Sequence, residues 1–327
     1  NTTGNNNVSV GREALEANTT ASNNTAVGYQ SLTANTTASD NTAVGAGALL
    51  ANTLGFNNSA LGRCALISNT EGDKNTSIGM STLRCNLTGC SNTAVGYTAL
   101  LKNTASNNSA VGDGALICNT TGGANNAFGS TALDNNTTGS ANTAIGNDAL
   151  DANTTASDNV AVGNGAMFAN TTGCQNTAIG RRALNTNITG DNNVAVGFCA
   201  LKLNTADNNT AVGHDALKTN STGTNNTAVG LCTLKTNTTG ASNSALGILA
   251  LELNTEGDFN TAIGREALQS NTTADNNTAV GYKSLEANTT GTLNVAVGSC
   301  ALLCNITGAE NTAVGMNAAR LTTGGAN

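Results

Sequence analysis

Small and apolar residues recur at fixed positions along this chain, in a pattern that repeats about every 17 residues. Each repeat is built on a motif of Asn, any residue, Ala or Ser, then Val, Ile, Leu or Phe, and finally Gly. The motif glycines are residues 11, 28, 45, 62, 79, 96, 112, 129, 146, 163, 180, 197, 213, 230, 247, 264, 281, 298 and 315. Sixteen of the eighteen intervals between them are 17 residues long and two are 16. A strict short period is typical of a solenoid, in which each coil buries its apolar face against its neighbours.

The remaining fixed positions define the unit when the motif glycine is numbered 0. Position +3 is always small, position +4 is Leu in seventeen units, and position +7 is Asn in eighteen of nineteen units. Seventeen residues are too few for a βα unit, and Gly at 0 with Gly or Asn near +10 would interrupt a helix. We therefore predict an all-β fold, a parallel β-solenoid (β-roll) of about 19 coils with two short strands per coil.

The first strand of each coil is expected from −4 to 0, as at 24–28, and the second from +3 to +7, as at 31–35. The motif glycine is expected at a corner that requires positive φ or close backbone approach. This structural role is assigned to Gly28, Gly45, Gly62, Gly79, Gly96, Gly146, Gly180, Gly230, Gly264 and Gly281. We expect one continuous solenoid domain over 1–327. Because both ends fall inside a repeat, we expect it to be a segment of a longer fibre or filament.

Two pairs of adjacent positions are apolar in most units: −2 with −1, usually Ala-Val, and +3 with +4, usually Ala-Leu. Successive strand residues face opposite sides, so one member of each pair is expected to point outward. A stripe of that length is too large for a soluble monomer, which favours burial against sister chains, for example in a three-fold bundle. The alternative is a corner within the pair that turns both side chains inward.

The recurrent asparagines at −4 and +7 have two interpretations. In a stacked coil, identical amides form a hydrogen-bonded ladder. Position +7 also forms Asn-x-Thr sequons, so a row of N-linked glycans is the other interpretation. The candidate glycosylation sites are Asn18, Asn35, Asn86, Asn119, Asn136, Asn153, Asn170, Asn187, Asn220, Asn237, Asn271, Asn288 and Asn305.

Composition argues against several functions. Charged residues make up only 10% of the chain and the net charge is −7, which disfavours nucleic-acid binding. No apolar run is long enough for membrane insertion. The single histidine, His214, occupies the variable position +1, and acidic residues are scattered without a recurring spacing. We therefore predict no enzyme, no catalytic residue, no cofactor and no metal.

Nine cysteines occupy only positions +2, +6 and +11. No Cys-x-x-Cys occurs, which disfavours a zinc site. Cys199 and Cys232 share position +2 but lie two coils apart, too far for a disulfide. The cysteines are therefore interpreted as free thiols that fill space among small residues, and the odd count leaves a bridge to another chain as the alternative.

Units such as 24–32 and 142–150 resemble the head repeats of trimeric autotransporter adhesins, and still more the Asn-Thr-Thr-Gly repeats of phage tail-fibre-like proteins. This resemblance covers essentially the whole chain. It implies a parallel β-roll, usually trimeric, on a cell or virion surface. The repeat is longer than the usual adhesin head repeat, and no coiled-coil stalk, membrane anchor or chaperone domain accompanies it here.

These observations favour a structural rod or fibre segment that is extracellular and displays a repetitive surface, in contact with sister chains or with a cell-surface receptor or glycan. One alternative is a subunit of an end-to-end, N-glycosylated extracellular filament. The other is an ice-binding solenoid, suggested by stacked Thr at −3, +8 and +9.

Overall fold

The computed structural model describes residues 1–323. Nineteen three-residue strands and no helix occur in that range. Two compact units, Asn1–Asn159 and Val160–Asn327, make up the chain. The first contains β1 (Val8–Val10), β2 (Thr25–Val27), β3 (Thr42–Val44), β4 (Ser59–Leu61), β5 (Thr76–Ile78), β6 (Thr93–Val95), β7 (Ser109–Val111), β8 (Asn126–Phe128) and β9 (Thr143–Ile145). The second contains β10 (Val160–Val162), β11 (Thr177–Ile179), β12 (Val194–Val196), β13 (Thr210–Val212), β14 (Thr227–Val229), β15 (Ser244–Leu246), β16 (Thr261–Ile263), β17 (Thr278–Val280), β18 (Val295–Val297) and β19 (Thr312–Val314).

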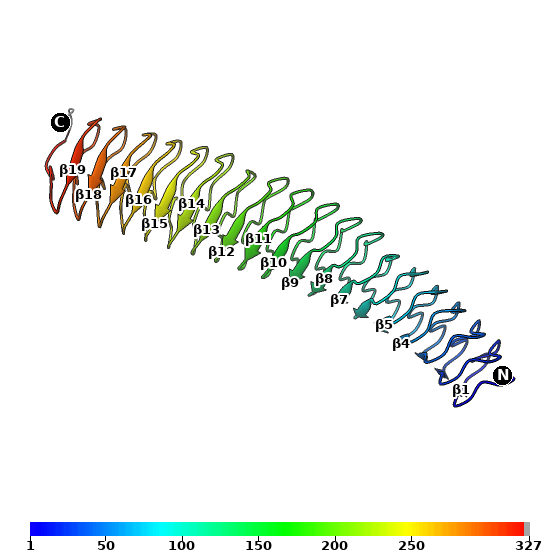
Figure 1. The fold of residues 1–327 in the computed structure, drawn as a ribbon. Coiled ribbons are helices and arrows are strands. Elements are labelled where there is room, and N and C mark those ends of the chain that lie inside the picture. The colour runs from blue at the N-terminus through cyan, green and yellow to red at the C-terminus, as the bar shows by residue number, and fades with distance from the viewer. Residues whose placement is uncertain (324–327) are drawn as a thin grey trace. The chain divides into compact units, whose positions relative to one another are not determined.

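Within each unit, every strand pairs in parallel with the equivalent strand of the next coil (Figure 1). The register joins identical positions of the repeat, so Ala26 pairs with Ala43 in the first unit and Ala178 with Ala195 in the second. The predicted all-β, parallel β-solenoid is therefore confirmed. The 16-residue interval that ends at Gly213 is absorbed outside the strands, because Ala195 still pairs with Ala211.

The prediction of two strands per coil is wrong. The strand covers only positions −3 to −1, and the segment from +3 to +7, as at 31–35, forms turns. The reason lies in the backbone: φ is +54° at Gln30 (+2) and +49° at Leu32 (+4), and the same alternation recurs in later coils. An extended strand requires negative φ at each residue. Hydrogen bonds between coils nevertheless continue through the turns, as from the Leu32 N–H to the Ala48 carbonyl oxygen (3.0 Å).

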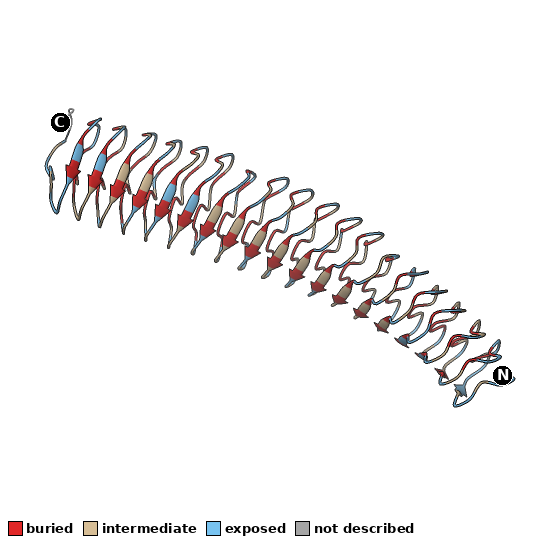
Figure 2. Cartoon of the chain, viewed as in Figure 1, coloured by how far each residue is buried: buried red, intermediate tan, exposed pale blue. Residues whose placement is uncertain are grey.

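The core is a thin layer of Ala and Leu. Position −2 is buried on the strand, as at Ala26, and positions +3 and +4 are both buried, as at Ala48 and Leu49. Positive φ at +4 turns the second side chain of that pair inward, so the corner interpretation holds there. The strand pair behaves differently, because position −1 remains partly exposed, as at Leu61. Figure 2 shows this division along the strands.

Two columns of buried asparagine link the coils. At +7, the Asn35 Nδ2 donates to Asn18 Oδ1 (3.2 Å) in the preceding coil and to the Ala38 carbonyl oxygen (2.9 Å). At −4, the Asn24 Nδ2 donates to that same carbonyl oxygen (3.0 Å), and its Oδ1 accepts from the backbone N–H of Asn41 (2.9 Å). The +7 column is thus an amide ladder. The −4 column bonds to backbone, and in some coils also from amide to amide, as from Asn142 Nδ2 to Asn125 Oδ1 (3.2 Å).

The motif glycine provides the corner after each strand. At the ten corner glycines named from the sequence, φ lies between +128° and +139°. A Cβ at Gly28 would also lie 2.6 Å from the carbonyl oxygen of Gly45 in the next coil. Left-handed backbone and close stacking therefore both require glycine at this position.

Candidate functional site: the outer face of the strands

The outward-facing residues of each strand form the most regular surface of both units. Positions −3 and −1 point away from the core, because the residue between them is buried in every strand from β2 to β19. Position −1 is aliphatic or Phe in each coil, and its members include residues exposed by about half, such as Leu61 (50%) and Leu246 (51%). We call the rows at −3, −1 and +1 the strand face.

Aromatic, cationic and large apolar side chains at +1 border the row at −1. In the first unit, the Arg12 guanidinium lies 5.7 Å from the ring centroid of Tyr29. In the second, Arg181 lies 5.9 Å from the ring of Phe198, which stacks on His214 with ring centroids 5.0 Å apart. Position +1 is variable in sequence, but in these places the side chains at +1 of neighbouring coils contact each other through cation–π or stacking interactions. The chemistry of the strand face therefore differs from one group of coils to another.

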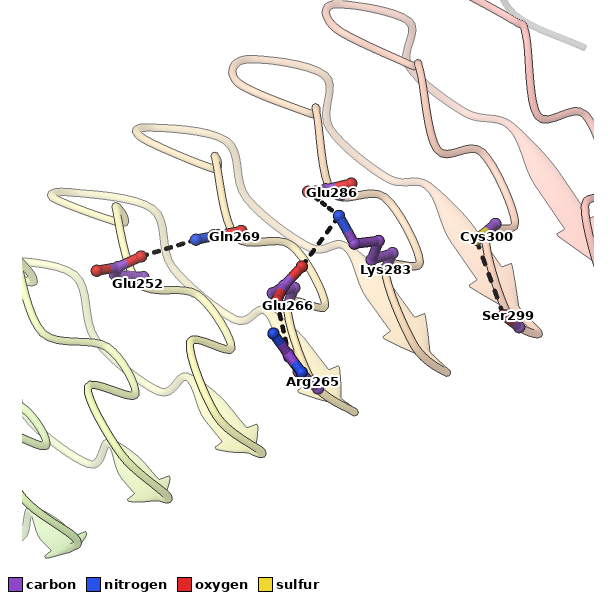
Figure 3. Close-up of polar contacts among 8 residues, drawn as sticks. All are labelled: Glu252, Arg265, Glu266, Gln269, Lys283, Glu286, Ser299 and Cys300. Atoms are coloured by element: carbon purple, nitrogen blue, oxygen red, sulfur yellow. Dashed lines mark hydrogen bonds and ion pairs between the residues drawn. The ribbon is translucent and has the colours of Figure 1, made fainter.

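At position +2, charged and polar side chains of some coils bond to those of neighbouring coils. In the first unit, the Gln30 Nε2 donates to Glu13 Oε2 (2.6 Å). In the second, Glu266 accepts from Arg265 Nε (2.8 Å) and pairs with Lys283 Nζ (3.0 Å), which also reaches Glu286 (2.8 Å) (Figure 3).

These contacts shift the protonation equilibria of the charged network. The hydrogen bond from Lys283 and the neighbouring Arg265 guanidinium hold the pKa of Glu266 below its ordinary value. The hydrogen bonds to Glu286 and Glu266 raise the pKa of Lys283. Both effects favour the charged forms, so the network carries opposite charges at neutral pH.

A second group of acids lies in the first unit and shows the opposite behaviour. Burial raises the pKa of Asp151 to about 6, with a further contribution from the charges of Asp134 and Asp148. Burial also raises the pKa of Asp134. Asp134 and Asp151 occupy the same position, +5, of successive coils, and Asp148 lies at +2 of the coil that holds Asp151, so the stacked coils place like charges near one another.

The thirteen sequon asparagines lie inside the coil. Asn18 is 2% exposed and the other twelve are 0% exposed. Their Nδ2 groups donate within the core, as Asn237 does to Asn220 Oδ1 (2.7 Å) and to the Gly240 carbonyl oxygen (2.8 Å). A glycan attaches to this nitrogen and needs solvent beside it. The folded coil has no room for it, so the structure argues against glycosylation at these thirteen positions.

None of the nine cysteines, all of which lie among the described residues, forms a disulfide. Cys199 is buried, Cys85 is exposed, and the other seven are intermediate in exposure. The buried Cys199 fits the interpretation as a space-filling residue, whereas the exposed Cys85 does not fill space in the core.

Two hollows of modest size open on the surface of the first unit. One, of about 410 Å³, is lined by residues that include Arg63, Met80 and Tyr97. The other, of about 320 Å³, is lined by residues that include Tyr29 and Ile67. Their linings contain thiol, hydroxyl and guanidinium groups but no histidine or carboxylate, so neither offers a general base to a nucleophile.

The fold and the strand face define this chain as a parallel β-solenoid repeat protein. No protein-family model matches the sequence, and a search of curated proteins finds no significant match. Among residues 1–323, no helix has the length and apolar character that a membrane span requires.

Proposed function

We propose that this chain is a structural element, a rod or fibre segment that displays a repetitive outer face and performs no catalysis. The observation that carries this proposal is the coil-to-coil ladder within each unit. Backbone bonds, such as that from the Leu217 N–H to the Thr233 carbonyl oxygen (3.0 Å), recur beside buried amide bonds, such as that from Asn220 to Asn204 (2.7 Å). The ladder joins one coil to the next at equivalent positions, which suits load-bearing and display.

The strand face supports self-association as part of this function. Its aliphatic row at −1 runs over consecutive coils, and Leu246 and Ile263 retain 51% and 41% exposure. Contiguous apolar surface beyond a few hundred Å² marks an interaction site on a soluble protein. Sister chains are the partner that offers a matching row with the same repeat spacing. The resemblance to adhesin heads and tail fibres agrees with a trimer on a cell or virion surface.

The experiment is a comparison of the native and denatured masses of the purified chain. We expect a native mass of three times 32.3 kDa. The variant Leu246→Lys with Ile263→Lys places two cations on the strand face and should yield single chains. The matched control Thr239→Lys adds a cation at an exposed turn position and should preserve the trimer. A wild-type chain that is monomeric at micromolar concentration would refute the self-association, and an open-ended ladder of masses would favour the filament.

Ice binding is a second candidate, favoured by the row of outward Thr at −3. The hydroxyl groups of Thr227, Thr261 and Thr278 have no hydrogen-bond partner among the described residues, so they are available to order water. The Thr row at +8 is unsuitable, because hydroxyls such as that of Thr238 donate to the next coil (Thr255 carbonyl oxygen, 2.8 Å). Thermal hysteresis of the purified chain tests this candidate, and freezing behaviour equal to that of an unrelated protein would eliminate it.

A further inference from the structure

Three side chains with metal-binding atoms meet at one place in the second unit. His214 (+1) and Asp215 (+2) follow β13, and Cys232 (+2) follows β14 in the next coil. The backbone N–H of Cys232 donates to the His214 carbonyl oxygen (2.9 Å), which fixes the two segments beside each other. Their ligand atoms all lie within 4.8 Å of one another, and this is the only such cluster among residues 1–323.

Asp215 supplies an independent sign that a ligand belongs here. The residue is 7% exposed, and its Oδ1 is buried without a hydrogen-bond partner. Its Oδ2 is engaged, since it lies 3.2 Å from Lys218 Nζ and 3.6 Å from His214 Nδ1. A buried carboxylate oxygen without a partner is costly, because it has lost water and gained nothing in return. A cation at Oδ1 would remove that cost.

The other two groups are held in position with their ligand atoms available. The His214 ring stacks on Phe198, which fixes its plane, while the side chain remains 53% exposed. Cys232 is intermediate in exposure and carries a free thiol. One ligand is therefore buried, one is intermediate and one is open to solvent, which gives an ion a route of entry and leaves a coordination position for water.

We propose that His214, Asp215 and Cys232 bind a divalent transition metal ion of the zinc type. Zinc takes imidazole nitrogen, carboxylate oxygen and thiolate sulfur together, at distances that place tetrahedral ligand atoms about 3.5 Å apart. His214 Nδ1 lies 3.6 Å from the other carboxylate oxygen of Asp215, Oδ2, and no two ligand atoms of the cluster are more than 4.8 Å apart. Tetrahedral spacing therefore requires shifts of about 1.3 Å at most. Carboxylate and thiolate together neutralise the two charges of the ion.

Lys218 is the group that competes with the ion, because its ammonium neutralises Asp215 in the same place. The metal would take Oδ1 and leave Oδ2 to the lysine, or displace the lysine to solvent, where its side chain is already 31% exposed. Binding would join two consecutive coils by their side chains, in addition to their backbone bonds. The proposal goes beyond the structural role above and does not depend on it.

The experiment is a titration of the reduced, metal-free full-length chain with Co²⁺, followed by its thiolate-to-cobalt charge-transfer absorption. We expect one ion per chain, displaced by Zn²⁺, and a rise in unfolding temperature with Zn²⁺. Cys232→Ser should abolish the charge-transfer band. The matched control is Cys300→Ser, which has the same position +2, similar exposure and the same bond to the preceding coil (Tyr282 carbonyl oxygen, 2.8 Å). That coil presents Tyr282 and Lys283 in place of His and Asp, so this control should keep the band.

Three further variants sharpen the result. His214→Gln changes an exposed side chain and should weaken Co²⁺ binding roughly tenfold or more without loss of fold, as judged by circular dichroism. Asp215→Asn should weaken it similarly. Lys218→Met should tighten it, because the competing cation is gone. The proposal is overturned by a wild-type chain without the band, by equal loss in Cys232→Ser and Cys300→Ser, or by unchanged affinity in His214→Gln.

Discussion

Replacement of one buried ladder asparagine, Asn237→Ala, tests what holds the coils together. Asn237 is 0% exposed and makes three side-chain hydrogen bonds. Its Nδ2 donates to Asn220 Oδ1 (2.7 Å) and to the Gly240 carbonyl oxygen (2.8 Å), and its Oδ1 accepts from Asn254 Nδ2 (2.8 Å). Alanine removes all three.

The groups left behind are not equally affected. The Gly240 carbonyl oxygen retains the Asn226 Nδ2 (2.8 Å), and Asn254 retains the Gly257 carbonyl oxygen (3.0 Å). Only Asn220 Oδ1 becomes a buried acceptor without a donor. With about 1 kcal/mol for each lost bond and about 1 kcal/mol more for the orphaned oxygen, the local cost is about 3 to 4 kcal/mol.

Native-state hydrogen exchange is the assay, because a repeat protein need not unfold in one step. We expect the opening free energy of the coils around Asn237 to fall by that amount, and that of distant coils to stay unchanged, since each coil interacts with its neighbours only. The control Thr239→Ala alters an exposed turn residue and should change it by less than about 0.5 kcal/mol. A change below about 1 kcal/mol in Asn237→Ala would refute the view that the amide ladder stabilises the solenoid.

Three other variants test the backbone and the charges. Gly28→Ala should locally unfold its coil, because φ is +138° and the added Cβ would lie 2.6 Å from the carbonyl oxygen of Gly45. We expect the amide protons of that coil to lose their protection from hydrogen exchange, and unchanged protection would contradict the argument. Asp151→Asn should raise the unfolding temperature at pH 7 but not at pH 3. The folded-state pKa of Asp151, about 6, exceeds the ordinary value of 3.8. The charged carboxylate therefore destabilises the fold increasingly as the pH rises from 3.8 to about 6. Glu266→Gln should act in the opposite sense. Because the pKa of Glu266 is lowered in the folded state, its charged carboxylate stabilises the fold at pH values above the unfolded-state pKa, and that stabilisation is lost in acid. The variant should therefore be less stable than wild type at pH 7 and equally stable in strong acid. Equal stability of the variant and the wild type at both pH values would contradict the argument.

The solenoid could be predicted from sequence because every coil needs the same residue types at its corner and in its core. Gly at 0, Ala at −2 and Leu at +4 repeat with the period, and a stacked coil is the architecture that aligns identical residues 17 positions apart. That the segment from +3 to +7 forms turns could not be predicted, because Leu at +4 suggests an extended, half-buried second strand. Leucine rarely adopts positive φ, yet Leu32 does so at +49°. Burial of the side chain and the hydrogen bond to Ala48 offset that local preference.

The two interpretations of the asparagines differ only in burial, and sequence does not report burial for a residue of this kind. Asn-x-Thr at 35–37 satisfies a sequon and also places an amide where it can bond to the coils on both sides. Geometry separates these interpretations: the Asn35 Nδ2 already donates to Asn18 Oδ1 and to the Ala38 carbonyl oxygen. Both hydrogens of the amide nitrogen are used, so no site for a glycan remains.

The proposed metal site shows why chemistry in a solenoid must be sought along columns and not along the chain. Along the chain, His214 and Asp215 are adjacent, but Cys199 and Cys232, the nearest cysteines, are each about one coil away, and those two cysteines are too far apart for a disulfide. Asp215 lies between those cysteines in the same column, one coil from each, and its neighbour His214 accepts the hydrogen bond from the Cys232 N–H. Residues at variable positions are free of the packing demands that fix Ala, Leu and Asn. A solenoid can therefore acquire a local site wherever suitable side chains occupy the same positions of successive coils, while its repeated residues keep the fold unchanged.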